Sequence, residues 1–186
     1  LKWSSKTNPL MLSRAEKLRE SWHLSDRAVI LAASTHEGEE LAILDSFLTV
    51  KAQYANRHPL LIIVPRHPER FDDVAKLIDA KNLPVIRRSQ DGEPAKSESV
   101  YLADSMGELG VWYALSDIAI VGGSLVNIGG HNPIEAAIVG KPIIMGQYTQ
   151  SCQLIVDQLK QSGALMQVNG SDELTQQLAH WLANPK

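Results

Sequence analysis

The sequence predicts a doubly wound α/β domain built on a Rossmann-like parallel sheet. Short apolar runs of strand length alternate with segments whose apolar residues recur every three or four positions, as in amphipathic helices. Strands that alternate with helices of this length form parallel sheets covered on both faces and joined by right-handed crossovers. A chain of 186 residues suits one ordinary domain that buries most of the surface its unfolded form would expose.

The elements follow in order along the chain. After an irregular opening, Arg27–Ser34 is an apolar run ending in turn residues, which predicts a buried strand. The helix after it extends from Gly38 to about Asn56, because its apolar residues form one stripe. Further strands are predicted at residues 60–64, 84–87, 100–102, 118–121, 142–145 and 164–168, and further helices at residues 71–81, 107–115, 133–139, 152–161 and 174–182.

Composition excludes several classes of protein. A net charge of −3 and a pI of about 6.1 argue against binding nucleic acid through the overall field. The single cysteine, Cys152, rules out an intramolecular disulfide and suits a reducing compartment such as the cytosol. The longest apolar stretches, such as residues 60–64, are too short to cross a bilayer. The chain begins at Leu1 with no signal-peptide pattern, so we expect it to be part of a longer protein.

The loop after the first strand, Ser34-Thr-His-Glu-Gly-Glu-Glu40, has two interpretations. It lacks the glycine spacing of a dinucleotide-binding loop, which disfavours a Rossmann dehydrogenase. Ser34 or Thr35 would cap the next helix, with acids in its first turn, or the loop would form a hydroxyl and amide pocket for an anion. His36 has no second histidine at metal-helix spacing, so no metal site is predicted.

The loops after the strands predicted at residues 60–64 and 100–102 carry an arginine and a glycine. Val64-Pro-Arg-His-Pro-Glu-Arg70 is stiffened by two prolines and presents Arg66 at a strand end, for either a phosphate or a surface salt bridge. His67 and Arg70 are weaker candidates. In Asp104-Ser-Met-Gly-Glu-Leu109, Ser105 resembles a helix N-cap with Glu108 as its partner, and Gly107 lets the backbone approach a base or ribose.

The fourth loop is the most informative. It reads Val121-Gly-Gly-Ser124, and then Gly129-Gly-His-Asn-Pro-Ile-Glu135 opens a helix. Asn132 as N-cap, Pro133 and Glu135 match the rules for a helix start. Capping does not explain the four glycines, whereas close approach to a phosphate would. Glu135 is therefore a candidate ligand for ribose hydroxyls as well as a first-turn acid.

Taken together, these loops resemble a known family. Four blocks, at residues 34–40, 64–71, 106–109 and 121–125 followed by 129–136, are similar to the signature blocks of bacterial Kdo (3-deoxy-D-manno-octulosonic acid) transferases and occur in the same order. The similarity extends from near Leu1 to the last predicted helix. One block departs from the family: Gln147 and Tyr148 stand where Pro-His is usual, so we expect no donor contact from that loop.

The resemblance implies a glycosyltransferase of lipopolysaccharide core biosynthesis with the two-domain GT-B architecture. Residues 1–186 would be the C-terminal half, which binds the donor CMP-Kdo and is inactive alone. The implied nucleotide contacts are Pro65, Arg66, Met106, Gly107, Glu108, Asn132, Pro133, Ile134 and Glu135. Candidate contacts to Kdo or phosphate are Ser34, Thr35, His36, Gly122, Gly123, Ser124, Gly130 and His131.

The remaining implications concern what lies outside the chain. The catalytic base, the surface for the lipid A precursor and the membrane association would belong to an N-terminal half at the cytoplasmic face of the inner membrane. The scheme needs no cofactor and no metal. Two alternatives remain open: a GT-B transferase or epimerase that uses a UDP-sugar, because a fold does not fix the chemistry, and a nucleotide-binding module without activity of its own.

Overall fold

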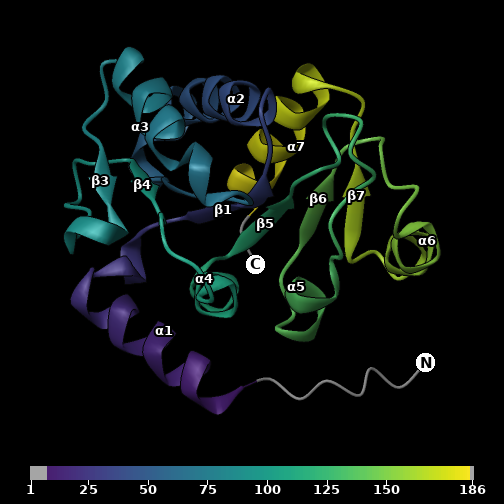
Figure 1. The fold of residues 1–186 in the computed structure, drawn as a ribbon, viewed down its shortest axis with the longest axis horizontal. Helices are drawn as coiled ribbons and strands as arrows, with labels where there is room; N and C mark the ends of the chain where they lie inside the picture. Colours follow the sequence, from purple (N-terminus) through teal and green to yellow (C-terminus); the bar gives the residue numbers. More distant parts are fainter. Residues whose placement is uncertain (1–7, 185–186) are drawn as a thin grey trace.

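The computed structural model describes residues 8–184, which form a seven-stranded, all-parallel sheet (Figure 1). The order across the sheet is β3-β4-β2-β1-β5-β6-β7. This confirms the predicted doubly wound parallel sheet. The strands are β1 (Val29–Thr35), β2 (Leu60–Pro65), β3 (Ile86–Arg87), β4 (Val100–Leu102), β5 (Ile118–Val121), β6 (Ile143–Met145) and β7 (Leu165–Gln167).

Helices cover both faces of this sheet (Figure 1). One face packs against α2 (Glu39–Gln53), α3 (Phe71–Ala80) and α7 (Ser171–Ala183). The other face packs against α1 (Pro9–Ser21), α4 (Leu109–Leu115), α5 (Ile134–Ile138) and α6 (Gln153–Gln161). Short 3-10 helices are η1 (Leu24–Asp26), η2 (Ala55–Arg57), η3 (Pro68–Arg70) and η4 (Arg88–Gln90). Between residues 8 and 184, no helix has both the length and the apolar character needed to cross a membrane.

The central strands read as unbroken apolar runs because both of their faces are buried. Every residue of β1 and of β2 is buried. Alternate side chains of β1 enter different cores: Val29 and Leu31 lie in the core on the α4 side, whereas Ile30 lies in the core on the α2 side. Each predicted strand and helix is present, with ends that differ by a few residues.

The helix α1 corrects the sequence analysis, which expected an irregular opening. Asn8 caps it by accepting a hydrogen bond from the Leu10 N–H (3.0 Å), and Pro9 occupies the first turn. Met11, Ala15 and Leu18 recur at helical spacing and pack in or against the core, but the exposed Leu10 and Leu12 beside them obscure this stripe in the sequence. It packs closely on α4, where a Cβ at Gly110 would lie 2.2 Å from the Met11 sulfur.

A cluster of aromatic rings joins α1, β4 and α4. The Trp22 ring lies 4.6 Å from that of Tyr101 and 6.2 Å from that of Trp112, measured between centroids. The Arg88 guanidinium lies 5.6 Å from the centroid of Trp112, within the range of a cation–π contact. The cluster therefore connects the core to an arginine on the loop after β3.

Candidate functional site

The four predicted loops meet at one edge of the sheet. Strands β4, β2, β1 and β5 are consecutive parallel neighbours, so the loops after their carboxyl ends lie next to one another. The chain proceeds from β1 to β2 on one side and later places β5 on the other side of β1. Strand order reverses there, and ligands of open α/β sheets bind outside such a reversal.

A buried carboxylate, Glu39, ties the β1 loop to the β5 loop. Its Oε1 accepts from the N–H groups of His36 (3.0 Å) and Gly123 (2.8 Å), and its Oε2 accepts from the N–H of Leu125 (3.0 Å). Glu39 is fully buried. Burial raises the pKa of its carboxyl, and the three N–H bonds offset that shift only in part. In the sequence Glu39 appeared only as a first-turn acid of the helix.

The predicted N-cap role of Ser34 or Thr35 is wrong. Strand β1 continues through Thr35, and the residue before the helix is Gly38, with a φ of 91°. Ser34 instead takes a left-handed conformation, with a φ of 56°, and supplies the carbonyl against which Gly122 packs. A Cβ at Gly122 would lie 2.2 Å from that oxygen, so only glycine fits there.

Two histidines from different loops meet above this junction. The Nε2 atoms of His36 and His131 are 2.6 Å apart, and the two rings are parallel to within 4°. The edge of the His67 ring faces His36, with 5.3 Å between centroids. Burial lowers the pKa of both His36 and His131, and the neighbouring His67 and Arg66 lower them further. The structure thus brings three candidates from three loops together.

Several predicted ligands are exposed along the same edge. Arg66 is exposed, and its backbone N–H donates a hydrogen bond to the Thr35 carbonyl at 2.9 Å. Its guanidinium forms no hydrogen bond or ion pair with any of residues 8–184. Met106 is 58% exposed, so its apolar side chain is available to a planar ring. The adjacent Gly107 has a φ of 78° and open space around it. Glu135 is also exposed.

The start of α5 differs slightly from the predicted cap. The helix begins at Ile134, one residue later than expected, so Pro133 and not Asn132 holds the N-cap position. Asn132 still caps it, because its Oδ1 accepts from the Ile134 N–H at 3.0 Å. Pro65 and Pro133 are buried, Ile134 is half-buried and Asn132 is exposed. Of these four predicted ligands, Asn132 is therefore the most accessible.

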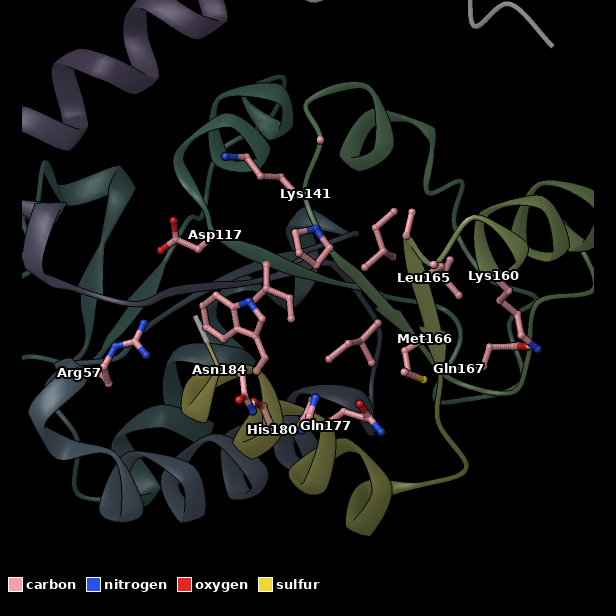
Figure 2. A pocket seen from close by; sticks show the side chains of 18 of the residues that line it. Arg57, Asp117, Lys141, Lys160, Leu165, Met166, Gln167, Gln177, His180 and Asn184 are labelled. Carbon is pink, nitrogen blue, oxygen red and sulfur yellow. Dashed lines mark hydrogen bonds between the residues drawn. The ribbon is translucent and has the colours of Figure 1, made fainter. Parts of the chain in front are cut away.

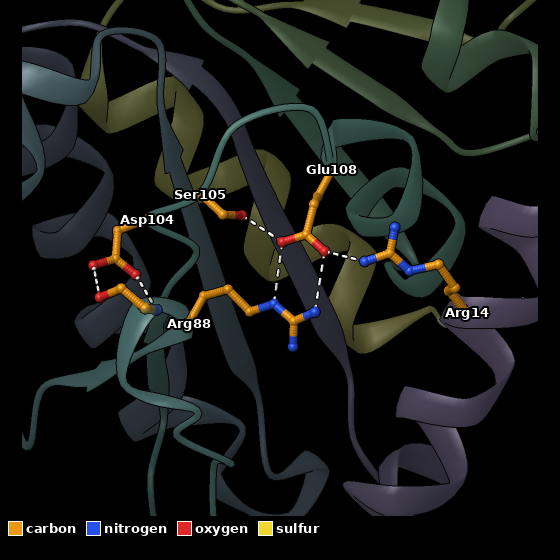
Figure 3. A network of polar contacts seen from close by, with 6 residues as sticks. Arg14, Arg88, Asp104, Ser105 and Glu108 are labelled. Atoms are coloured by element: carbon orange, nitrogen blue, oxygen red, sulfur yellow. Dashed lines mark hydrogen bonds and ion pairs between the residues drawn. The ribbon is translucent and has the colours of Figure 1, made fainter.

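Glu108 lies at the centre of a polar network (Figure 3). Its carboxylate accepts two hydrogen bonds from Arg88, at 3.1 and 3.0 Å, and one from the Ser105 hydroxyl at 2.6 Å. Arg14 of α1 forms a further ion pair with it. Burial raises the pKa of Glu108, but the bonds from Arg88 and Ser105 outweigh it and hold the pKa below the usual value.

This network changes two interpretations of the third loop. Ser105 does not cap α4, since the helix begins at Leu109 after Glu108 and the Ser105 hydroxyl bonds the Glu108 side chain. The carboxylate is also largely occupied by arginines, so it orders the loop that carries Met106 and Gly107. Arg14 and Arg88 were missed by the sequence analysis, because neither adjoins a strand end of the predicted site.

Of the remaining candidates, Ser124 and Gly130 form hydrogen bonds within the loops, and Thr35 is buried. The buried Ser124 hydroxyl donates to the Val121 carbonyl at 2.6 Å and accepts from the Gly146 N–H at 2.8 Å, which attaches the β6 loop to the β5 loop. Gly130 donates its N–H to the Gly123 carbonyl at 2.8 Å and closes the turn that carries His131. Thr35 is 1% exposed, and its hydroxyl has no hydrogen-bond partner among the described residues.

A cavity of about 1020 Å³ lies at the opposite edge of the sheet (Figure 2). It is lined by residues around the amino ends of β5, β6 and β7, including Asp117, Lys141 and Leu165, and by the end of α7 with Trp181. None of the predicted ligands lines it. Among residues 8–184 there is also no group of three or more histidine, cysteine or acidic side chains placed to hold a metal ion.

Comparison with known proteins gives the family. The chain is 41% identical over its full length to the 3-deoxy-D-manno-octulosonic acid transferase of Haemophilus influenzae and covers 43% of that protein. It therefore spans less than half of this relative. A search of protein-family models finds no match.

Solved structures agree with this similarity. The C-terminal CMP-Kdo binding domain of WaaA from Acinetobacter baumannii is 37% identical and superposes with a TM-score of 0.90, over 96% of this chain and 92% of that one. The C-terminal domain of a group 1 glycosyl transferase, LpcC of Francisella tularensis, is 12% identical with a TM-score of 0.59, which shows a shared fold alone. The matches to the H. influenzae transferase and to the A. baumannii domain confirm the resemblance drawn from the loop motifs. The chain therefore belongs to the 3-deoxy-D-manno-octulosonic acid transferase family.

Proposed function

We propose that this chain is the donor-binding domain of a transferase that moves Kdo from CMP-Kdo to a lipid A precursor. The observation that carries the proposal is the collection of Arg66, Met106, Gly107 and Glu135, all exposed, on the carboxyl edge of the sheet. The A. baumannii domain named for CMP-Kdo binding shares this fold at 37% identity, which supports the same ligand here.

Each exposed group suits one part of the nucleotide. The Arg66 guanidinium matches a phosphate, because its planar fork donates two hydrogen bonds to neighbouring oxygens. Met106 and Gly107 would lie against the base, and the Glu135 carboxylate would accept from the ribose hydroxyls. Arg66, and not the N-terminus of α5, is the main phosphate-binding group in this proposal. Helix α5 has only five residues, and its Ile134 N–H already donates to the Asn132 side chain.

The proposed reaction displaces CMP from the anomeric carbon of Kdo. The acceptor hydroxyl oxygen forms the new bond to that carbon, and the bond from the carbon to the phosphate oxygen breaks, with its electron pair leaving on CMP. Arg66 would stabilise the charge that develops on the phosphate, an electrostatic effect that is large in a preorganised site. The hydroxyl proton would pass to a base in the N-terminal half of a two-domain protein, which would also bind the acceptor and associate with the inner membrane.

Calorimetric titration of the domain with CMP, UMP and inorganic phosphate tests the donor site. We expect CMP to bind more tightly than UMP or phosphate. Arg66→Ala and Glu135→Ala should each weaken CMP binding at least about tenfold, equivalent to about 1.4 kcal/mol, because each removes a ligand contact. Lys160→Ala is the matched control, since Lys160 is exposed but lines the cavity at the opposite edge.

Other outcomes would favour the alternatives. A preference for UMP would indicate a UDP-sugar transferase or epimerase. Equal binding by the wild type and both variants would mean that these loops do not hold the nucleotide. In the full-length protein, unchanged CMP-Kdo turnover after Arg66→Ala would contradict the role given to that arginine.

A further inference from the structure

The contact between His36 and His131 limits the protons that the two rings can hold. At 2.6 Å between Nε2 atoms, one nitrogen must carry a hydrogen and the other must accept it. A doubly charged pair would place two N–H hydrogens in the same gap. While the rings are in contact, the pair therefore carries at most one positive charge.

The groups around the pair do little to balance a positive charge on it. His67 faces His36, and Arg66 lies close enough to lower the pKa of both His36 and His131. Of the acids near His36, Glu40 raises the pKa of His36 but is paired through its Oε2 with Arg70 at 2.8 Å, and Glu39 is held by three backbone N–H groups. On the α6 side, Cys152 offers only a weak thiol contact to the His131 carbonyl, at 3.7 Å. The surroundings therefore favour an anion next to the pair over a further proton on it.

The two rings can separate without movement of the backbone that carries them. The His36 N–H is fixed by Glu39, and the His131 N–H donates to the Gly122 carbonyl at 3.0 Å. Both side chains are half-buried, so rotation about their own torsions moves the Nε2 atoms apart. Two N–H groups that share one oxyanion need their nitrogens about 4–5 Å apart.

We propose that His36 and His131 form a clasp that opens around an oxyanion of the donor and takes up one proton as it opens. This inference rests on the proposed function and adds a proton to the binding step. The oxyanion is either the nucleotide phosphate or the carboxylate of the sugar. A negative charge between the rings stabilises imidazolium, so the second nitrogen gains its hydrogen from solvent.

The sign of the pH dependence follows from the two states. In the free domain the pKa values of both rings lie below the usual value for histidine. Binding an anion raises them, so affinity increases as the pH falls from about 8 towards the usual histidine pKa of about 6.5, by at most about tenfold per pH unit for one proton. Affinity stops rising once the free rings are themselves protonated.

Calorimetry at pH 7.5 in Tris and in HEPES measures the proton directly, because the apparent enthalpy changes with the ionisation enthalpy of the buffer. With CMP as the probe, we expect the wild type to take up about one proton more than a variant that carries both His36→Gln and His131→Gln, because neither glutamine can be protonated. Protonation of CMP itself cancels in this difference. His180→Gln, an exposed histidine on α7, is the control and should match the wild type.

The ligands separate the two sources of oxyanion. Uptake with CMP alone assigns the clasp to the phosphate, and uptake only when free Kdo is added assigns it to the carboxylate. Equal proton numbers in the wild type and the double variant in both titrations, with CMP still bound, would overturn the clasp and leave the proposed donor site intact. Such a result would mean that a shift of tautomer supplies the second N–H.

Failure of CMP to bind would count against the proposed function, but a measurement that does not need CMP still tests the clasp. Nitrogen-15 NMR of the histidine rings should show one Nε2 protonated and the other unprotonated in the free domain. Inorganic pyrophosphate should convert both to the protonated form. Two rings that titrate independently at the usual histidine pKa would overturn the shared proton.

Discussion

Replacing Gly122 with alanine is expected to destabilise the domain by about 3 kcal/mol or more, because the new Cβ would overlap backbone atoms that cannot rotate away. It would lie 2.2 Å from the Ser34 oxygen and 2.7 Å from the Ser34 carbonyl carbon. Strands β1 and β5 would have to separate where their loops form the proposed donor site. The measurement is thermal or urea unfolding, and for a domain of this size the midpoint should fall by about 6–12 °C.

Gly163→Ala is the control for Gly122→Ala. Gly163 has a φ of 80° and no atom near its missing Cβ, so alanine there costs only the left-handed backbone, about 1–2 kcal/mol. We also expect CMP binding to weaken in Gly122→Ala and to persist in Gly163→Ala. Equal stability of the two variants would show that the β1–β5 junction accommodates a methyl group.

Replacing Glu39 with glutamine is expected to cost about 2–4 kcal/mol although the two side chains have nearly the same shape. Glutamine has one acceptor oxygen, and its NH₂ group would face a backbone N–H that Glu39 now satisfies. A buried donor left without an acceptor costs about 1–3 kcal/mol, and the repulsion between two donors adds to this. Urea unfolding at neutral pH measures the change.

Glu37→Gln provides the comparison for Glu39→Gln. Glu37 is exposed in the same loop, and its substitution should change stability by no more than about 0.5 kcal/mol. The Glu39 result also tests its protonation, since burial raises the pKa of this carboxyl. A protonated carboxyl resembles the amide, so a Glu39→Gln variant as stable as the wild type would show that Glu39 is uncharged in the folded domain.

The elements from β1 to α7 could be predicted because each carries a pattern that local physics imposes. Strand β2 is an unbroken apolar run because both faces of the sheet are covered. Helix α1 was missed because the exposed Leu10 and Leu12 obscure the core-facing stripe that contains Met11, Ala15 and Leu18. The Asn8-Pro9 pair was a second signal for this helix.

The composition of the site was easier to predict than its contacts. Loops that follow parallel strands point to one edge, so Arg66, Gly107 and Glu135 could be selected from the sequence. The meeting of His36 with His131 depends on β5 lying beside β1, which the order of strands along the chain does not reveal. Glu39 was missed for the same reason, because its Gly123 partner comes from the neighbouring strand.

The aromatic cluster beneath the third loop gives the domain an optical reporter of its own. Trp112 is fully buried and lies against Arg88, and Arg88 holds the carboxylate of Glu108. Indole emission depends on nearby charge, so any ligand that displaces Glu108 from Arg88 alters the field at this ring. Trp112 is thus connected through Arg88 and Glu108 to the loop that carries Met106 and Gly107. Its emission would report ligand binding at that loop without an added label.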